Sequence, residues 1–173
     1  AENGFIQLLN DKSVKKITFS RNPYTRLLSC YLHRIVGEKR QNPSKLNLFR
    51  HSNFSNQSLP SFAQFIEFVC LQEPIEMERH WKLQKHMVLG DLLDFDFIGK
   101  QETLLDDLQI LNGILFSGTG PIVADYEQIR EGPMQTNATR KTEDYWTKNL
   151  VEITYSKFQE DFEFFGYDKE LPL

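Results

Sequence analysis

The stretch KKITFSRNPYTRLLSCYLHRI, residues 15 to 35, constrains the fold most because it joins a strand to a helix without a spacer. Residues 14–20 alternate and are rich in β-branched and aromatic side chains, which predicts a strand. Pro23 suits the first turn of a helix, and apolar residues then recur at helical spacing. The pattern predicts an amphipathic helix over 23–36 that ends at Gly37.

Three further segments carry helical patterns, and a second short strand lies between them. Residues 61–71 predict a helix with Ser61 as its N-cap, and residues 102–115 and 143–165 predict helices with apolar stripes. FDFIG, residues 95–99, predicts the second strand. Segments 38–60 and 116–141 are predicted loops. We therefore expect one helix-rich α/β domain over residues 1–173, with a parallel sheet at its core.

Composition excludes several classes of protein. A chain of 173 residues with 40% hydrophobic and 13% aromatic residues can bury a core, which argues against disorder. No apolar run approaches the roughly 18 residues of a membrane span. Cys30 and Cys70 lie in apolar helical patterns, so we expect free thiols in a reducing compartment rather than a disulfide scaffold.

The charge of the chain is uneven, although its net value is only −4. Residues 11–50 carry ten Lys and Arg against Asp11 and Glu38. A basic block in an acidic chain favours a bound anion, with a solvated basic face as the alternative. We do not expect nucleic acid as the partner, because no aromatic-basic repeat or known DNA-binding motif accompanies the block.

Arg21 falls at the carboxyl end of the first predicted strand, where ligands of open α/β sheets bind. Its guanidinium can hold a phosphate through two parallel hydrogen bonds. Ser29 lies off the centre of the apolar stripe on the next helix, so its hydroxyl can donate to the same anion. The alternative is that Arg21 pairs with an acidic neighbour and Ser29 bonds its own helix backbone.

RNPYTRLLSCY, residues 21–31, resembles the 3′-phosphate-binding motif of sulfotransferases, in which the pattern is R-x-P-x-x-R-L-x-S-x-Y. Three later segments continue the resemblance: HW at 80–81 with Gln84 after it, FDFIGKQETLLDD, and the terminal FEFFGYD. Their order is similar to that of the carbohydrate sulfotransferase superfamily, which includes the chondroitin sulfotransferases and bacterial relatives. The resemblance covers about residues 15–168 and implies a P-loop NTPase-like sulfotransferase fold.

The resemblance implies transfer of a sulfuryl group from 3′-phosphoadenosine 5′-phosphosulfate to a hydroxyl, with a carbohydrate as the expected acceptor. Arg21 and Ser29 would hold the donor's 3′-phosphate, and Arg26 would position the helix. NATRKT, residues 137–142, resembles a loop that closes over the nucleotide in some sulfotransferases. Arg140 and Thr142 would be its contacts, with an exposed basic turn as the alternative.

His80 is the best candidate in this chain for the base that takes the acceptor's proton. The alternatives are that His80 and Trp81 shape the acceptor pocket, or that His80 bonds a backbone carbonyl. We expect no metal ion, because His80 and His86 are six residues apart and the cysteines are distant.

The family also uses a loop after its first strand, with a lysine that reaches the 5′-phosphosulfate. AENGFIQLLNDKSVKK contains no such loop, so we expect this strand and loop upstream of Ala1; the alternative is that the protein has lost this half of the donor site. The alternative function is a sulfotransferase-like module without catalysis that binds a nucleotide or a sulfated glycan. A bacterial member would lie in the cytoplasm, and a eukaryotic one in the Golgi lumen.

Overall fold

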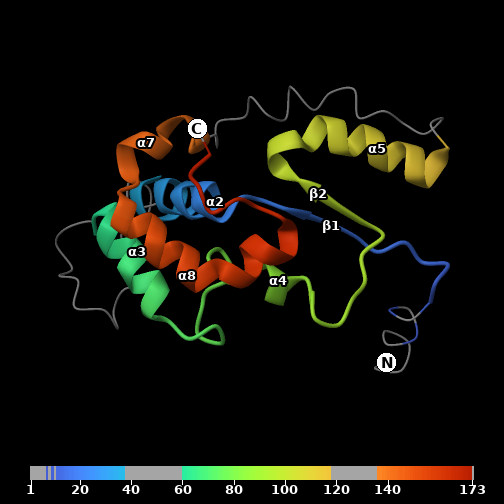
Figure 1. Ribbon diagram of the computed structural model, residues 1–173, viewed down its shortest axis with the longest axis horizontal. Helices are drawn as coiled ribbons and strands as arrows, with labels where there is room; N and C mark the ends of the chain where they lie inside the picture. Colours follow the sequence, from blue (N-terminus) through green and yellow to red (C-terminus); the bar gives the residue numbers. More distant parts are fainter. Residues whose placement is uncertain (1–6, 8, 10, 38–59, 118–135, 173) are drawn as a thin grey trace.

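The computed structural model describes residues 7, 9, 11–37, 60–117 and 136–172, which form a helix-rich α/β structure. The elements in chain order are β1 (Ile17–Ser20), α2 (Pro23–Cys30), η1 (Tyr31–Gly37), α3 (Phe62–Leu71), α4 (Gln84–Met87), β2 (Phe97–Lys100), η3 (Gln101–Thr103), α5 (Leu104–Phe116), η4 (Thr139–Lys141), α7 (Thr142–Tyr145) and α8 (Lys148–Phe165). Helices α2, α3, α7 and α8 gather at one end of the molecule, while α5 lies apart from them (Figure 1). The predicted loop 38–60, except Pro60, and residues 118–135 of the second loop lie outside the described residues.

Strands β1 and β2 form a parallel two-stranded sheet, with Ile17 paired to Phe97 and Ser20 paired to Lys100. Both predicted strands are confirmed, although each is only four residues long. Because the strands are parallel, their carboxyl ends meet at one edge of the sheet, and a helix or helical turn follows each strand closely. The sequence therefore brings the residues after Ser20 and after Lys100 to the same edge.

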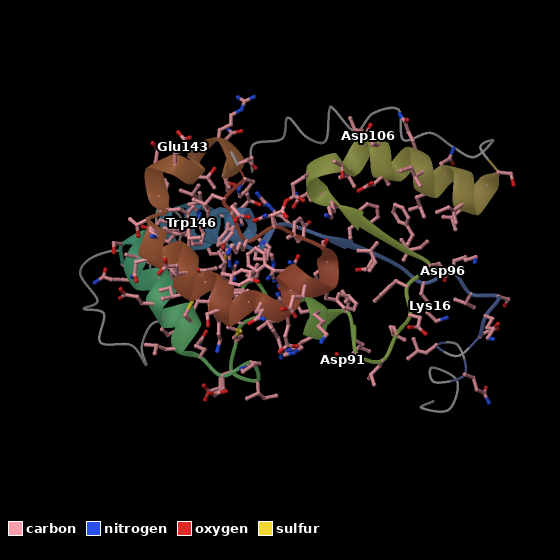
Figure 2. The ribbon with its side chains drawn as sticks, viewed as in Figure 1. Lys16, Asp91, Asp96, Asp106, Glu143 and Trp146 are labelled. Atoms are coloured by element: carbon pink, nitrogen blue, oxygen red, sulfur yellow. The ribbon has the colours of Figure 1, made fainter. Side chains whose placement is uncertain are left out.

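The amino ends of the two strands are joined by a carboxylate. Asp96 accepts hydrogen bonds from Nζ of Lys15 at 2.8 Å and from the backbone N–H of Lys16 at 2.9 Å. Figure 2 shows Lys16 and Asp96 near each other, before the strands begin. This contact fixes the register of the sheet at the end away from the helices.

Gly99 makes room for an aromatic ring on the neighbouring strand. It is paired with Phe19, and a Cβ atom at Gly99 would lie 2.3 Å from Cε1 of the Phe19 ring. Real side chains do not tolerate such an approach, so a glycine is required for this packing.

The core lies among α2, α3, α7 and α8 and is rich in aromatic rings. The Tyr24 ring lies 5.0 Å from the ring of Trp146 and 4.9 Å from that of Phe162, measured between centroids. Trp146, labelled in Figure 2, is 7% exposed, and Tyr24 is fully buried. Edge-on aromatic contacts of this kind stabilise a core beyond the area that they bury.

The helix predicted over 23–36 is present, but its geometry changes halfway. Asn22 caps α2 by accepting the backbone N–H of Tyr24 at 2.9 Å, and Pro23 occupies the first turn. From Tyr31 the chain continues to Gly37 as the π-helix η1. A π-helix widens the turn, so side chains after Tyr31 point away from the directions that a period of 3.6 predicts.

The helix predicted over 143–165 is two helices, because Thr147 starts a new one. Its hydroxyl accepts the backbone N–H of Leu150, which makes it the N-cap of α8. Helix α8 ends at Gly166, whose φ of +62° is the left-handed conformation that favours glycine. The helices α3 and α5 are confirmed near their predicted bounds, whereas the short α4 was not predicted.

Neither Cys30 nor Cys70 forms a disulfide in the described part of the chain, as the sequence predicts. Burial raises the pKa of Cys70 to about 11, so its thiol stays protonated at neutral pH. Among the residues described by the structure, no helix is both long and apolar enough to cross a membrane.

Asp161 on α8 is a fully buried carboxylate that caps α4. Its Oδ2 accepts the backbone N–H of Gln84 and its Oδ1 accepts that of Lys85, each at 2.8 Å. Burial raises the pKa of Asp161, although these bonds and the nearby Arg26 act to lower it. A helix of four residues has almost no stability of its own, so α4 depends on this carboxylate.

We expect Asp161→Ala to lower the free energy of unfolding by about 2–5 kcal/mol, because two buried N–H groups lose a charged acceptor. Asp161→Asn, which keeps one acceptor oxygen, should lose less. Urea unfolding at neutral pH measures both. An Ala variant as stable as the wild type would contradict the role of this carboxylate.

The same carboxylate predicts a pH dependence. In the folded protein the pKa of Asp161 is raised above the ordinary value of 3.8. At pH values between the unfolded and the folded pKa, the folded state therefore binds more protons than the unfolded state. The stability of the wild type relative to Asp161→Asn should therefore fall as pH rises from below 3.8 through the folded pKa, and should be constant above it. Unfolding curves of both proteins across the acid range test this, and a difference that grows with pH would contradict it.

Candidate functional site: an anion-binding cavity

A cavity of about 560 Å³ lies at the carboxyl end of β1. It is lined by Phe19, Ser20, Arg21, Arg26, Ser29, Cys30, His33, Arg34, His80, Gln84, Gln101, Leu104 and Thr136. Among these described residues are three arginines and two histidines, and none carries a carboxylate. A concave surface with positive charge only is suited to an anion. Three predicted site residues, Arg21, Ser29 and His80, are brought together here.

Arg21 is held at the end of β1 by both its backbone and its side chain. Its Nε donates to Oγ1 of Thr25 at 3.1 Å, which turns the guanidinium along the first turn of α2. Within the described part of the chain, no acceptor is bonded to its terminal Nη1 and Nη2 groups. Burial lowers the pKa of Arg21 from its ordinary value, while Glu102 and Tyr167 act to raise it. An arginine remains charged despite such a shift, so the N–H groups of Nη1 and Nη2 (the guanidinium fork) are available to an anion.

Gln84 fixes the backbone of Arg21. Its Oε1 accepts the N–H of Arg21 at 3.0 Å, and its Nε2 donates to the carbonyl of Arg21 at 2.8 Å. This pair of bonds continues the sheet pattern through a side chain, at the point where β1 has no further backbone partner. Because Asp161 holds Gln84 in turn, the position of Arg21 depends on a carboxylate in α8.

Ser29 faces the same cavity from α2, two turns after Arg21. Its hydroxyl is hydrogen-bonded to that of Thr136 at 2.9 Å. A hydroxyl has one hydrogen to donate, so one hydroxyl of this pair donates to the other, and the second is left to donate to an anion. Thr136 was not predicted, although it lies immediately before the NATRKT segment.

Arg26 binds protein groups rather than leaving its side chain free for a ligand. Its Nη1 donates to the carbonyl of Lys82 at 2.7 Å and its Nη2 to that of Arg79 at 3.2 Å. Burial lowers its pKa, and Asp161 acts against this shift. These bonds fasten the 79–82 segment to α2, which agrees with a positioning role for Arg26.

His80 lines the cavity from that fastened segment. Its Nδ1 lies 2.6 Å and 2.8 Å from the two carboxylate oxygens of Glu78. The ring is 31% exposed, so it is accessible from the cavity without being fully solvated. This contact is with a carboxylate, and not with the backbone carbonyl that the sequence left as an alternative.

Arg140 and Thr142 do not line the cavity. The Arg140 side chain is exposed on η4. Thr142 is buried, and its hydroxyl donates to the carbonyl of Thr139 at 2.5 Å. Their predicted contacts with a nucleotide stay predictions; Thr136, immediately before this segment, lines the cavity.

A network around Glu102 supports the edge of the cavity. Its carboxylate accepts the backbone N–H of Asn22 at 2.8 Å and the hydroxyl of Tyr167 at 3.0 Å. The Tyr167 hydroxyl is also 3.1 Å from that of Ser20. Burial raises the pKa of Tyr167, so its hydroxyl stays protonated. The C-terminal FFGYD segment therefore contributes to the site as well as to the core.

One group in the described residues has the donor atoms of a metal site: His86, Asp91 and Glu160. The ammonium of Lys85 already lies among them, 2.5 Å from Asp91 and 3.2 Å from Glu160. A lysine in this position neutralises the carboxylates that a cation would need, so the group is best described as a surface ion-pair network.

The chain matches the sulfotransferase family over residues 5–168. It belongs to that family, which accounts for both the strand-to-helix joint and the basic cavity.

Curated relatives agree with this assignment at low identity. The chain is 28% identical to carbohydrate sulfotransferase 12 of Xenopus laevis over 176 residues, covering 91% of the chain and 41% of that protein. It is 24% identical to carbohydrate sulfotransferase 8 of Mus musculus over 169 residues, covering 89% of the chain and 40% of that protein. The chain thus spans about two fifths of the length of these relatives. No solved structure matches the chain.

Proposed function

We propose that the full-length protein transfers a sulfuryl group from 3′-phosphoadenosine 5′-phosphosulfate to a hydroxyl of a carbohydrate. The observation that carries this proposal is the basic cavity, which brings Arg21, Ser29 and His80 together and has no carboxylate among its described lining residues. The names of the relatives support a carbohydrate as the acceptor. Sulfuryl donors and their products are anions, which is the kind of ligand that such a cavity favours.

In this proposal, the free fork of Arg21 binds the donor's 3′-phosphate through two N–H groups, and Ser29 donates a further bond. Thr136 supports Ser29 through the bond between their hydroxyls. The P-loop-like part of the fold, with its loop for the 5′-phosphosulfate, belongs to the proposal for the full-length protein. Arg140 and Thr142 stay candidate contacts of the nucleotide, reached by a closing movement of their segment.

The chemistry needs one proton transfer. The acceptor oxygen forms a bond to sulfur, the bond from sulfur to the 5′-phosphate oxygen breaks, and the acceptor's proton passes to Nε2 of His80. The bisphosphate leaves with the bonding electrons, and the surrounding arginines stabilise its charge. No metal ion takes part in this proposal. The cellular compartment, either bacterial cytoplasm or Golgi lumen, stays a prediction from the resemblance.

We expect Arg21→Ala in the full-length protein to weaken binding of adenosine 3′,5′-bisphosphate by roughly ten- to a hundredfold, since a charged two-pronged contact is lost. Binding of adenosine 5′-monophosphate should change little. Calorimetry with both nucleotides measures the difference.

Arg21→Lys should recover only part of the affinity, because an ammonium cannot form two parallel hydrogen bonds as a guanidinium does. Arg79→Ala is the matched control, since its exposed side chain does not line the cavity. Equal losses for both nucleotides would contradict the assignment of Arg21.

We expect His80→Ala to lower turnover by roughly 10²–10⁴-fold with donor affinity unchanged, which is the effect of removing one general base. Turnover of a labelled donor with a panel of glycans, divided by the folded fraction, measures this. His86→Ala is the control, because His86 lies outside the cavity lining. Normal turnover in a folded His80→Ala protein would exclude the catalytic role. A wild type that binds the bisphosphate but sulfates no glycan would favour the non-catalytic binding module.

A further inference from the structure

We infer that Glu78 is the positioning residue for His80: it fixes the imidazole so that Nδ1 carries the proton and Nε2 is free to accept one. The inference rests on the proposed role of His80 as base. It assigns a function to a residue that no sequence pattern singled out, because a glutamate two positions before a histidine is common and carries no signal by itself.

The geometry of the pair determines which nitrogen is the donor. Both oxygens of Glu78 lie within 2.8 Å of Nδ1 of His80. A carboxylate can only accept hydrogen bonds, so Nδ1 must donate. In the neutral ring the other nitrogen, Nε2, then carries a lone pair. No residue described by the structure bonds Nε2, which leaves it available to a hydroxyl in the cavity.

Glu78 is itself held in place by backbone bonds. Its Oε2 accepts the backbone N–H of His80 at 2.9 Å, and its carbonyl accepts the N–H groups of Trp81 at 3.0 Å and Lys82 at 2.8 Å. The carboxylate therefore both starts this turn and orients the ring, and the two roles use different bonds.

Buried neighbours anchor the turn on both sides. Met77 is 5% exposed and Trp81 is 1% exposed, and Nε1 of Trp81 donates to Oε1 of Gln72 at 2.7 Å. On the other side of the turn, Arg26 bonds the carbonyls of Arg79 and Lys82 from α2. The pair of Glu78 and His80 thus sits on a rigid support rather than on a free loop, as precise positioning requires.

The charges around the ring give Glu78 a second effect. The charged or titratable groups that share the cavity with His80 are Arg21, Arg26, Cys30, His33 and Arg34. Arg79 lies on the outer side, with its Nε 3.9 Å from Glu78. The arginines oppose a positive charge on His80, and Glu78 is the carboxylate in contact with the ring. It therefore stabilises the imidazolium that forms when the acceptor's proton is taken.

The experiment combines Glu78→Ala and Glu78→Gln in the full-length protein with two readouts. Nitrogen-15 NMR of the His80 ring should show the proton on Nδ1 in the wild type and in Glu78→Gln, whose amide oxygen can still accept it. In Glu78→Ala the proton should redistribute toward Nε2. This readout requires no substrate.

Turnover should fall about 10- to 100-fold in Glu78→Ala, the loss usual for a group that orients a metal-binding histidine, with donor affinity unchanged. Glu78→Gln should lose less than Glu78→Ala but should still be slower than the wild type, because its amide oxygen can accept from Nδ1 but lacks the charge that stabilises the imidazolium. Glu78→Ala combined with His80→Ala should be no slower than His80→Ala alone. Glu76→Ala is the matched control, since Glu76 is an exposed glutamate in the same segment.

The two proposals fail in different ways. Full turnover in folded His80→Ala would overturn the base, and with it the catalytic meaning of Glu78. A large loss in His80→Ala, together with unchanged turnover and an unchanged ring tautomer in Glu78→Ala, would overturn the role of Glu78 and leave the base in place. Should the Ala variant fail to fold, Glu78→Gln carries the test: turnover equal to that of the wild type would overturn the inference.

Discussion

A single buried carboxylate determines where the cavity's main cation lies. Asp161 holds the first N–H groups of α4, α4 presents Gln84, and Gln84 binds both backbone groups of Arg21. Burying a carboxylate is unfavourable by itself, which is why its pKa is raised. The buried carboxylate in turn fixes the end of β1. The geometry of the site therefore depends on helix α8 as much as on the motif at residues 21–31.

Positive and negative groups occupy different parts of the site. Positive groups line the cavity, while the carboxylates of Glu78 and Glu102 lie behind them and outside its lining. Each of the two binds a group that the cavity uses: Glu78 binds the ring of His80, and Glu102 binds the backbone of Asn22, which caps α2. Acidic residues can thus orient cationic and hydrogen-bonding groups from outside the lining of the cavity.

The sequence predicted most of the elements because their signals are local. The strand-to-helix joint, the Ser61 cap and the apolar stripes depend on neighbours within a few residues, and the structure has all of them. The helix start at Thr147 was missed, because one polar residue does not interrupt the periodicity of an apolar stripe. The π-helix after Tyr31 was missed, because a widened turn does not change the pattern of apolar residues in the sequence.

The site residues could likewise be predicted only where their signal is local in the sequence. Arg21 and Ser29 follow from a contiguous motif, whereas other contributors arrive from distant segments. Thr136, Gln84 and Glu102 meet the motif only through the tertiary fold, and no spacing rule relates residues that are sixty or more positions apart. Arg140 and Thr142 were chosen from residues 137–142, none of which lines the cavity, whereas Thr136, immediately before them, does.

The contact between Gly99 and Phe19 links the sheet interior to ligand recognition. Phe19 also lines the cavity, so the ring is shared between the packing of two strands and the wall of the site. Any side chain at Gly99 would displace this ring toward the ligand or out of the sheet. Gly99, which is not among the lining residues, therefore determines through Phe19 the shape of the space that the cavity offers.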